Sequence, residues 1–468
     1  MQSLCDWCQY CGKGSEHSVK TLIGEEESHI ADEELLDAIN AVIKEKGVDS
    51  TAEANIYVGR DTRASSERLS NAVIDGIVAG EGKVNDFGLT ATPQLHYMVL
   101  CVNTNGQYGE PTESGYYRKL SKAFIKLNGV HGAQVVAKNY EPSVVVDGAN
   151  GVGAHKIKLM KEYLGNSLNV EVINDGNGVL NELCGADFVK VQQKAPKGLD
   201  LQIGKRYLSY DGDADRIIYF YKNSTDGRFH MVDGDKIAVL IASHLKQLLI
   251  SSKLSDIELC IIQTAYANGS STQYIQNTLQ LPVHCMPTGV KYLHHRAQQS
   301  DIGVYFEANG HGTVTFSSNT IDRIKQSSSD AALELMSFID LVNQTVGDAI
   351  SDMLVIETIL RSRGQSIQEW DDLYTDLPNR NIKVNVKDRN VITTGDAERK
   401  CLTPIGLQDR IDEIVQKYGP NSRSFVRPSG TEDAVRVYAE SSTQQKADSL
   451  ATEVAAVVSQ LADGVQNK

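Results

Sequence analysis

The sequence predicts a multidomain α/β protein, and three observations carry that prediction. The chain has 468 residues, too many for one ordinary hydrophobic core and enough for three or four domains. Short apolar runs alternate with amphipathic segments of helical period, which is typical of mixed or parallel sheets covered by helices. Glycine clusters stand between several of these strands and helices, where they allow close packing.

Composition and charge narrow the classes of partner. The chain is 41% hydrophobic and 23% charged, with no apolar run long enough to span a membrane. Its net charge of -14 argues against nucleic acid or an anionic membrane as a partner. A small anionic substrate would need basic groups gathered locally. The beginning of the chain lacks the pattern of a secretory signal, so we expect a cytoplasmic protein of unknown oligomeric state.

The cysteines fit that location. Five of the eight are isolated in apolar or loop contexts, as reduced thiols of a cytosolic protein would be. The other three, Cys5, Cys8 and Cys11, form a C-x-x-C-x-x-C pattern that could be half of a zinc or iron–sulfur site. No fourth ligand pattern stands nearby, so we predict no metal there.

The first part of the chain reads as a helix, a strand and a helix after a polar, unpatterned start at residues 1–23, for which we expect disorder. The three elements are expected at residues 28–46, 54–59 and 65–80. Arg60 and Arg63 stand just before the second helix, where they could bind an anion. Pairing of these arginines with Asp61 and Glu67 is an equally good interpretation.

A strand, a glycine-rich turn and a helix then follow one another over residues 144–164. The turn resembles a dinucleotide-binding fingerprint only loosely, and such a turn is weak evidence by itself. Glycines in this position more often just permit close packing of the strand and the helix.

Three aspartates at alternate positions make the most informative loop. Alternate side chains of an extended backbone point the same way, so Asp211, Asp213 and Asp215 can converge on one point. Like charges that close repel unless a divalent cation neutralises them, and Mg²⁺ accepts carboxylates together with water and phosphate oxygens. Arg216 adds a fixed cation, and the apolar residues 217–221 predict a buried strand that anchors the loop.

This loop has two other interpretations. An acidic loop is often only solvated surface, although the spacing and the following strand favour a site. An EF-hand is excluded, because Arg216 stands where its glycine belongs and Lys222 where its closing glutamate belongs.

A second series of strands and helices follows a polar step at residues 251–256, which we take as a domain boundary. Strands are expected at residues 259–263, 283–286 and 302–306, and helices at 236–249, 270–280 and 292–299, with two more between 331 and 360.

The strand at 302–306 ends in a polar, glycine-rich loop. In open α/β sheets ligands lie beyond the carboxyl ends of strands. Glu307 and Asn309 could therefore bind sugar hydroxyls, with the glycines letting the ring approach. A structural ion pair for Glu307 and a buried, satisfied His311 explain the same residues equally well.

The last domain is entered at residues 371–378, and a turn at 427–433 joins two of its strands. Hydroxyls, the backbone N–H groups of Gly430 and Thr431, and the flanking Arg427 and Arg436 are what a phosphate requires. An ordinary turn with surface arginines is the alternative, but two arginines flanking one turn favour phosphate. An amphipathic helix is expected at 442–463.

These motifs together resemble the α-D-phosphohexomutases. The matching stretches are residues 59–63 (GRDTR), 211–216 (DGDADR), 288–291 (TGVK), 307–312 (EANGHG) and 427–433 (RPSGTED). The fourth stretch points to the acetylhexosamine branch of that family. The resemblance covers the chain from about residue 22 to its end.

The resemblance implies three αβ domains with mixed sheets and a C-terminal α+β domain around a central cleft, at residues 1–122, 123–252, 253–370 and 371–468. It implies Mg²⁺ on Asp211, Asp213 and Asp215. It places the sugar against Glu307, Ala308 and Asn309, with Thr288, Gly289 and Lys291 close by. It assigns the phosphate that is not transferred to Arg427, Pro428, Ser429, Gly430, Thr431 and Arg436.

The implied reaction interconverts N-acetylglucosamine 6-phosphate and 1-phosphate through a phosphoserine and a bisphosphate, on the route to UDP-N-acetylglucosamine. The family's nucleophilic serine lies in a Thr-Ala-Ser-His-Asn-Pro loop that this sequence does not contain, so the catalytic nucleophile is unassigned. We expect the chain to begin after that loop, with an incomplete first domain whose sheet edges and apolar helix faces are uncovered.

The missing loop leaves two main hypotheses. The chain is either such a mutase or a catalytically inactive form that binds Mg²⁺ and sugar phosphate without turnover. A metal-dependent phosphatase with a nucleophilic aspartate in the acidic loop is a weaker third interpretation.

Overall fold

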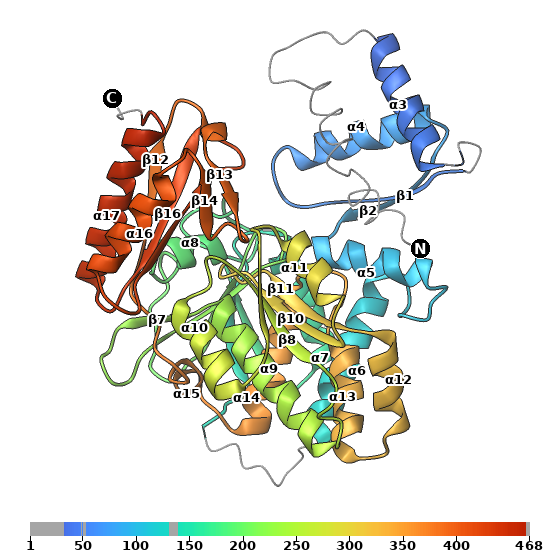
Figure 1. Ribbon diagram of the computed structural model, residues 1–468. Helices are drawn as coiled ribbons and strands as arrows, with labels where there is room; N and C mark the ends of the chain where they lie inside the picture. Colours follow the sequence, from blue (N-terminus) through green and yellow to red (C-terminus); the bar gives the residue numbers. More distant parts are fainter. Residues whose placement is uncertain (1–31, 48, 50–52, 131–138, 465–468) are drawn as a thin grey trace.

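A computed structural model gives the structure of residues 32–47, 49, 53–130 and 139–464. The expected disorder at residues 1–23 and the Cys5–Cys11 pattern lie outside this part of the chain. Figure 1 shows the body of the molecule flanked by the blue N-terminal elements on one side and the red C-terminal domain on the other. Each sheet lies within one of the four domain ranges predicted above.

The first domain is built on two parallel strands. β1 and β2 pair from Asn55 opposite Lys83 to Val58 opposite Asp86, with a shift in register before Arg60. Gly80 follows the helix between these strands, and its N–H bonds to the Gly76 carbonyl oxygen. Two apolar side chains of that helix, Leu69 and Val73, are each 51% exposed. The elements are α3 (Asp32–Lys46), β1 (Asn55–Arg60), α4 (Ser66–Ala79), β2 (Lys83–Leu89) and α5 (Thr92–Asn103).

The second domain is a mixed five-stranded sheet in the order β4-β3-β5-β6-β7, in which only β6 runs opposite to the other strands. β5 is fully buried and β6 is buried apart from its last residue, Lys222, as a central position requires. Its strands are β3 (Ser143–Asp147), β4 (Asn169–Ile173), β5 (Tyr207–Tyr210), β6 (Ile217–Lys222) and β7 (Phe229–Val232). Its helices are α6 (Glu113–Val130), α7 (Val152–Leu164), α8 (Ala186–Gln192) and α9 (Gly234–Ser251).

The third domain is a mixed four-stranded sheet in the order β11-β10-β8-β9, with only β11 antiparallel. Its strands are β8 (Leu259–Thr264), β9 (Val283–Met286), β10 (Ile302–Phe306) and β11 (Gly312–Phe316). Its helical elements are α10 (Gly269–Gln273), the π-helix η1 (Tyr274–Leu279), α11 (Val290–Ala297), α12 (Ser318–Gln326), α13 (Asp330–Leu341), α14 (Ala349–Arg363) and α15 (Ile367–Asp371). One hydrophobic cluster runs from Ala91 to Trp370, so the second and third domains share a core.

The fourth domain has a separate core under an antiparallel sheet in the order β12-β16-β15. Its strands are β12 (Asn379–Asn385), β15 (Arg423–Pro428) and β16 (Ala434–Glu440), and β13 (Thr393–Gly395) and β14 (Lys400–Thr403) form a separate hairpin. The 3-10 turn η2 (Arg389–Val391) precedes this hairpin. The helices are α16 (Leu407–Lys417) and α17 (Gln444–Leu461).

The multidomain α/β fold with mixed sheets is confirmed. One local prediction is wrong, because the helix expected at 270–280 is α10 followed by the π-helix η1. Several short elements were not predicted at all. β7 has four residues and β13 three, too few for an alternation of apolar and polar positions to show.

Two further features concern the surroundings of the protein. No helix among the described residues combines the length and apolar character needed to cross a membrane. The five cysteines in this part of the chain, Cys101, Cys184, Cys260, Cys285 and Cys401, are all free thiols.

Candidate active site

The three aspartates of the acidic loop converge as predicted. Carboxylate oxygens of Asp211, Asp213 and Asp215 all lie within 4.8 Å of one another. The loop is closed by its own bonds, because the N–H groups of Asp215 and Arg216 donate to Asp211 Oδ1 over 3.0 and 3.2 Å. β6 begins at Ile217 directly behind it, so a rigid strand carries the cluster.

The electrostatics of this trio call for a cation. Burial first, and then the charge of Asp215 and the charge of Asp213, raise the pKa of Asp211 well above its usual range. Asp215 Oδ1 is buried and accepts no hydrogen bond. Arg216 Nε lies 3.7 Å from Asp211 and 3.8 Å from Asp215, too far to hydrogen-bond either. Three carboxylates and an unsatisfied buried oxygen fit Mg²⁺, which takes such oxygens as ligands.

The glycine-rich turn before α7 supports this loop from behind. A Cβ on Gly151 would lie 2.4 Å from the Gly212 carbonyl oxygen, so no larger residue fits there. Val152 N also donates to that oxygen over 3.1 Å. Close packing therefore explains the turn, and the second interpretation offered for it holds.

The first domain reaches the same loop. Thr92 Oγ1 donates to Asp213 Oδ2 over 2.8 Å, and Arg63 Nη2 lies 3.7 Å from Asp213 Oδ1. Arg63 also pairs with Asp61, so that part of the ion-pair interpretation is correct. A cavity of about 450 Å³ opens here, with Arg60, Arg63, Thr92, His96 and Asp213 among its lining residues. Asp213 is thus the aspartate that faces the first domain.

The loop after β10 contacts the acidic loop at residues 211–216 (the metal loop) through backbone and side-chain atoms. Ile217 N donates to the Gly310 carbonyl oxygen over 3.2 Å. Gly310 has φ +87°, and a Cβ there would lie 1.9 Å from the Ile217 oxygen. His311 Nδ1 lies 3.6 Å from Asp215 Oδ2, and burial lowers the pKa of this imidazole. His311 Nε2 is buried without a hydrogen bond, which does not support the interpretation of His311 as a fully satisfied histidine.

Glu307 is held by hydrogen bonds and not by an ion pair among the contacts of the described residues. Gly289 N donates to its Oε1 over 3.1 Å, and Asn309 Nδ2 donates to its Oε2 over 3.2 Å. Asn309 Oδ1 in turn accepts from His311 N over 3.0 Å. Glu307, Ala308 and Asn309 are half-buried, so the loop presents polar groups at a partly open surface.

The turn at residues 427–433 (the phosphate turn) joins β15 to β16, and the two arginines lie on these strands, Arg427 on β15 and Arg436 on β16. Arg427 and Arg436 are direct cross-strand neighbours, and like charges so placed repel unless an anion lies between or beside them. Here each has a carboxylate partner, with Arg427 Nε 3.1 Å from Glu398 Oε1 and Arg436 Nη2 2.8 Å from Glu432 Oε1. Gly430 and Thr431 at the tip are exposed, and their side of the turn is open to a ligand.

Two residues near these loops were missed from the sequence. His96 lies on α5, one helical turn after Thr92, and that i, i+4 spacing was the signal that could have found it. Burial is the largest influence on its pKa, which is lowered. Glu398 was also missed, and no local pattern marks it.

The acidic loop at residues 211–216, the loop at residues 307–312 and the turn at residues 427–433 therefore come from three domains, and the first domain contacts the acidic loop. Four domains that each lend a loop to one acidic, partly buried region define the class of α-D-phosphohexomutases.

Comparison with known proteins narrows the class. Models of domain II and domain III of phosphoacetylglucosamine mutase match residues 109–218 and 233–365. Phosphoglucomutase/phosphomannomutase models match residues 17–108 (domain I) and 381–457 (C-terminal domain). The domain I match begins at residue 17, a few residues before the position near 22 where the resemblance was expected to begin.

Whole relatives agree with the domain matches. Phosphoacetylglucosamine mutase of Homo sapiens is 53% identical over 444 residues, which are 93% of this chain and 81% of that protein. The enzyme of that name from Saccharomyces cerevisiae is 44% identical over 87% of this chain and 76% of its own length. The crystal structure of Aspergillus fumigatus N-acetylphosphoglucosamine mutase with GlcNAc-6P and magnesium matches with a TM-score of 0.85 and 45% identity, covering 91% of this chain and 81% of that one. The chain belongs to the phosphoacetylglucosamine mutase family.

Proposed function

We propose that this chain is a Mg²⁺-dependent mutase that interconverts N-acetylglucosamine 6-phosphate and N-acetylglucosamine 1-phosphate through a phosphoserine and a bisphosphate. The observation that carries the proposal is the convergence of three aspartates within 4.8 Å of one another. The relatives that bear this activity in their name, and the neighbour solved with GlcNAc-6P and magnesium, support it.

The metal would be held by Asp211, Asp213 and Asp215. Bound there, Mg²⁺ supplies neutralisation of the charge that develops on a phosphoryl group in transfer. Arg216 lies next to the trio and is also paired with Asp187 over 3.1 Å. Burial alone would lower the pKa of Arg216, but the attraction of Asp211, Asp187 and Asp215 outweighs burial and raises it. The guanidinium therefore stays charged beside the reacting region.

The sugar would lie against Glu307, Ala308 and Asn309, with Thr288, Gly289 and Lys291 beside it. Glu307 and Asn309 already orient each other, so their remaining lone pairs and N–H groups are fixed in direction. Fixed polar groups can distinguish one arrangement of hydroxyls from another, because a wrongly placed hydroxyl leaves them unpaired.

The phosphate that is not transferred would bind Arg427, Pro428, Ser429, Gly430, Thr431 and Arg436. Guanidinium groups and backbone N–H groups together grip a phosphate firmly without acting on it. A clamp that is remote from the metal can accept either end of a sugar bisphosphate. That property lets the bisphosphate turn over in the site, so that one phosphoryl group is added at one end of the sugar and the other is removed from the opposite end.

We further infer four domains at residues 1–122, 123–252, 253–370 and 371–468, and a cytoplasmic protein. The free thiols support a reducing compartment. A differential alkylation experiment in cells would show these thiols reduced.

A coupled assay tests the mutase proposal. The purified chain is given N-acetylglucosamine 6-phosphate, Mg²⁺ and glucose 1,6-bisphosphate, and formation of the 1-phosphate is followed. Turnover supports the proposal. Binding of the sugar phosphate without turnover supports the inactive binding form instead, and release of free phosphate supports the phosphatase.

A further inference from the structure

Glu398 connects two of the loops assigned to substrate binding, although nothing in its own segment suggests a role. Its Oε2 accepts from the Thr288 N–H over 3.0 Å and from the Thr288 hydroxyl. Its Oε1 accepts from Arg427 Nε over 3.1 Å. One carboxylate therefore ties the loop before α11 in the third domain to the phosphate turn in the fourth. The side chain is 16% exposed, so solvent weakens these bonds little.

The backbone around Glu398 holds this side chain in place. Asp396, Ala397 and Glu398 have φ of 50°, 53° and 68°, three successive left-handed residues without a glycine. Arg399 closes the turn, because its Nη2 donates to Asp396 Oδ1 over 2.6 Å and its Nε to the Asp396 carbonyl oxygen over 3.1 Å. A strained turn that is closed by its own bonds gives Glu398 a defined position.

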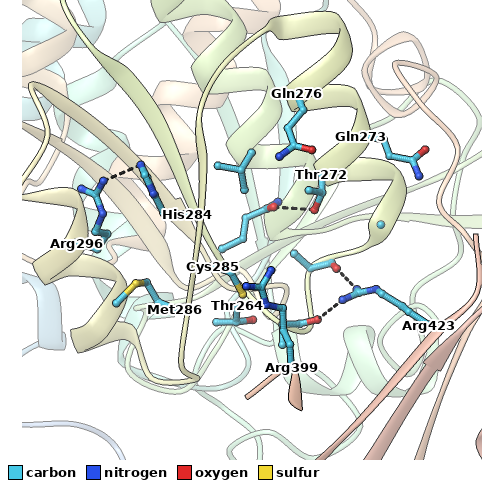
Figure 2. Close-up of a pocket in the computed structure, with 15 residues that line it drawn as sticks. Thr264, Thr272, Gln273, Gln276, His284, Cys285, Met286, Arg296, Arg399 and Arg423 are labelled. Atoms are coloured by element: carbon cyan, nitrogen blue, oxygen red, sulfur yellow. Dashed lines mark hydrogen bonds between the residues drawn. The ribbon is translucent and has the colours of Figure 1, made fainter. Parts of the chain in front are cut away.

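The turn is not simply part of the packed interface between the two domains. On its other side Arg399 lines a cavity of about 450 Å³ with Cys285 and Met286 (Figure 2). Arg423 lines the same cavity and also joins the two domains, because it donates to the carbonyl oxygen of Ala265 over 2.9 Å and to that of Ala267. This contact between Arg423 and the third domain does not involve Glu398.

The charge of Glu398 suits a supporting role toward Arg427. A guanidinium has five N–H donors, and Glu398 takes the one at Nε, so a phosphate can bind the same group as a second partner. Burial alone would lower the pKa of Arg427, but Glu398 and Tyr266 outweigh burial and raise it. A partly buried guanidinium that is paired at one edge is held in one orientation before ligand arrives.

We propose that Glu398 is a positioning residue for the sugar phosphate: it fixes Arg427 and the Thr288 loop in the arrangement that receives the phosphate. This inference rests on the proposed function, because it takes the phosphate turn as the binding site. The role goes to Glu398 because its carboxylate is the acceptor that the two loops share.

Calorimetric titration of the full chain with N-acetylglucosamine 6-phosphate in Mg²⁺ tests the inference. Glu398→Gln keeps an acceptor for Thr288 and removes the charge facing Arg427. We expect the Kd for the sugar phosphate to rise about tenfold, as for loss of a hydrogen bond between charged groups. The Kd for Mg²⁺ should not change, because the metal loop lies in another domain, and an unchanged value also shows that the variant is folded.

Glu413→Gln is the matched control. It makes the same chemical change at an exposed position on α16, where Glu413 lies 3.8 Å from Arg410, so sugar-phosphate affinity should stay as in the wild type. Thr288→Val is a second variant that keeps the N–H donor and loses the hydroxyl, and it should weaken the sugar phosphate in the same direction by a smaller factor.

Failure of the proposed function and failure of the positioning role would give different results. A wild-type chain that binds Mg²⁺ but no sugar phosphate contradicts the proposed function. A wild type that binds, with Glu398→Gln binding equally well, overturns the positioning role. Tighter binding by Glu398→Gln also overturns it and shows that Glu398 competes with the phosphate for Arg427.

Discussion

Asp213 differs from the other two aspartates because a second domain touches it. Asp211 is bonded to backbone N–H groups of its own loop, whereas Asp213 accepts from Thr92 Oγ1 and lies near Arg63. The Asp213 carboxylate could therefore bind a metal, and it also contacts the first domain. This makes Asp213 the informative residue to change.

Asp213→Asn should weaken Mg²⁺ binding by about tenfold or more, because a charged ligand oxygen becomes a neutral one. Asp187→Asn is the control, since Asp187 also pairs with Arg216 but is not in the trio. Calorimetry with Mg²⁺ alone measures the Mg²⁺ affinity of both variants. Equal Mg²⁺ affinity in wild type and Asp213→Asn would show that the trio is not the metal site.

At the scale of elements, the glycine-rich turn before α7 packs directly against the metal loop. Gly151 packs against Gly212 with no room for a Cβ, and Val152 N donates to the Gly212 carbonyl oxygen over 3.1 Å. The acidic loop is therefore positioned by the start of α7 as well as by β6. A substitution in this turn should therefore alter Mg²⁺ binding, although it changes none of the residues that would bind the metal.

Gly151→Ala should lower stability by about 2 kcal/mol, as overpacking does, and weaken Mg²⁺ binding. Gly129→Ala is the control: a Cβ at this position in α6 meets nothing within 4 Å, and alanine favours a helix. Thermal unfolding and Mg²⁺ titration of both variants provide the comparison. If Gly151→Ala is destabilised but binds Mg²⁺ as tightly as the wild type does, the turn does not position the metal site.

α11 carries a histidine that should make the third domain sensitive to acid. Burial first, and then the nearby His295 and His96, lower the pKa of His294 to about 4, and its Nδ1 lies 3.0 Å from the Tyr305 hydroxyl. The folded pKa is below the ordinary value of about 6.5, so the stability present above pH 6.5 is lost as pH falls toward 4.

His294→Gln removes this titration and should reduce the acid-induced loss of stability at pH 4.5 by about 2 kcal/mol relative to wild type. Unfolding midpoints measured across this pH range decide the matter. Parallel curves for wild type and His294→Gln would be inconsistent with a buried neutral imidazole.

At the scale of the whole molecule, one path of contacts runs through the loops of all four domains. Thr92 meets Asp213 at one end, His311 lies beside Asp215 in the middle, and Glu398 bonds to Thr288 and Arg427 at the other end. The second and third domains share their core with α5 of the first domain, whereas the fourth domain has a core of its own. The contact between Glu398 and Thr288 is therefore the step of the path that joins the two cores.

Sequence reasoning found what is repeated or continuous along the chain. The aspartate trio was predictable because the spacing of two residues and the apolar run after it are both local. The Glu398 contacts were not, because Thr288 stands 110 residues before it and Arg427 29 residues after it. Hydrogen bonds across such separations depend on how the domains meet, and no short-range pattern encodes that.

The most direct test of the account is calorimetric titration of the wild-type chain with N-acetylglucosamine 6-phosphate, with and without Mg²⁺. The account predicts binding that Mg²⁺ strengthens, and an Asp213→Asn variant in which that strengthening is lost. A folded wild type that takes up no sugar phosphate in the presence of Mg²⁺, or takes it up equally well without the metal, would contradict it.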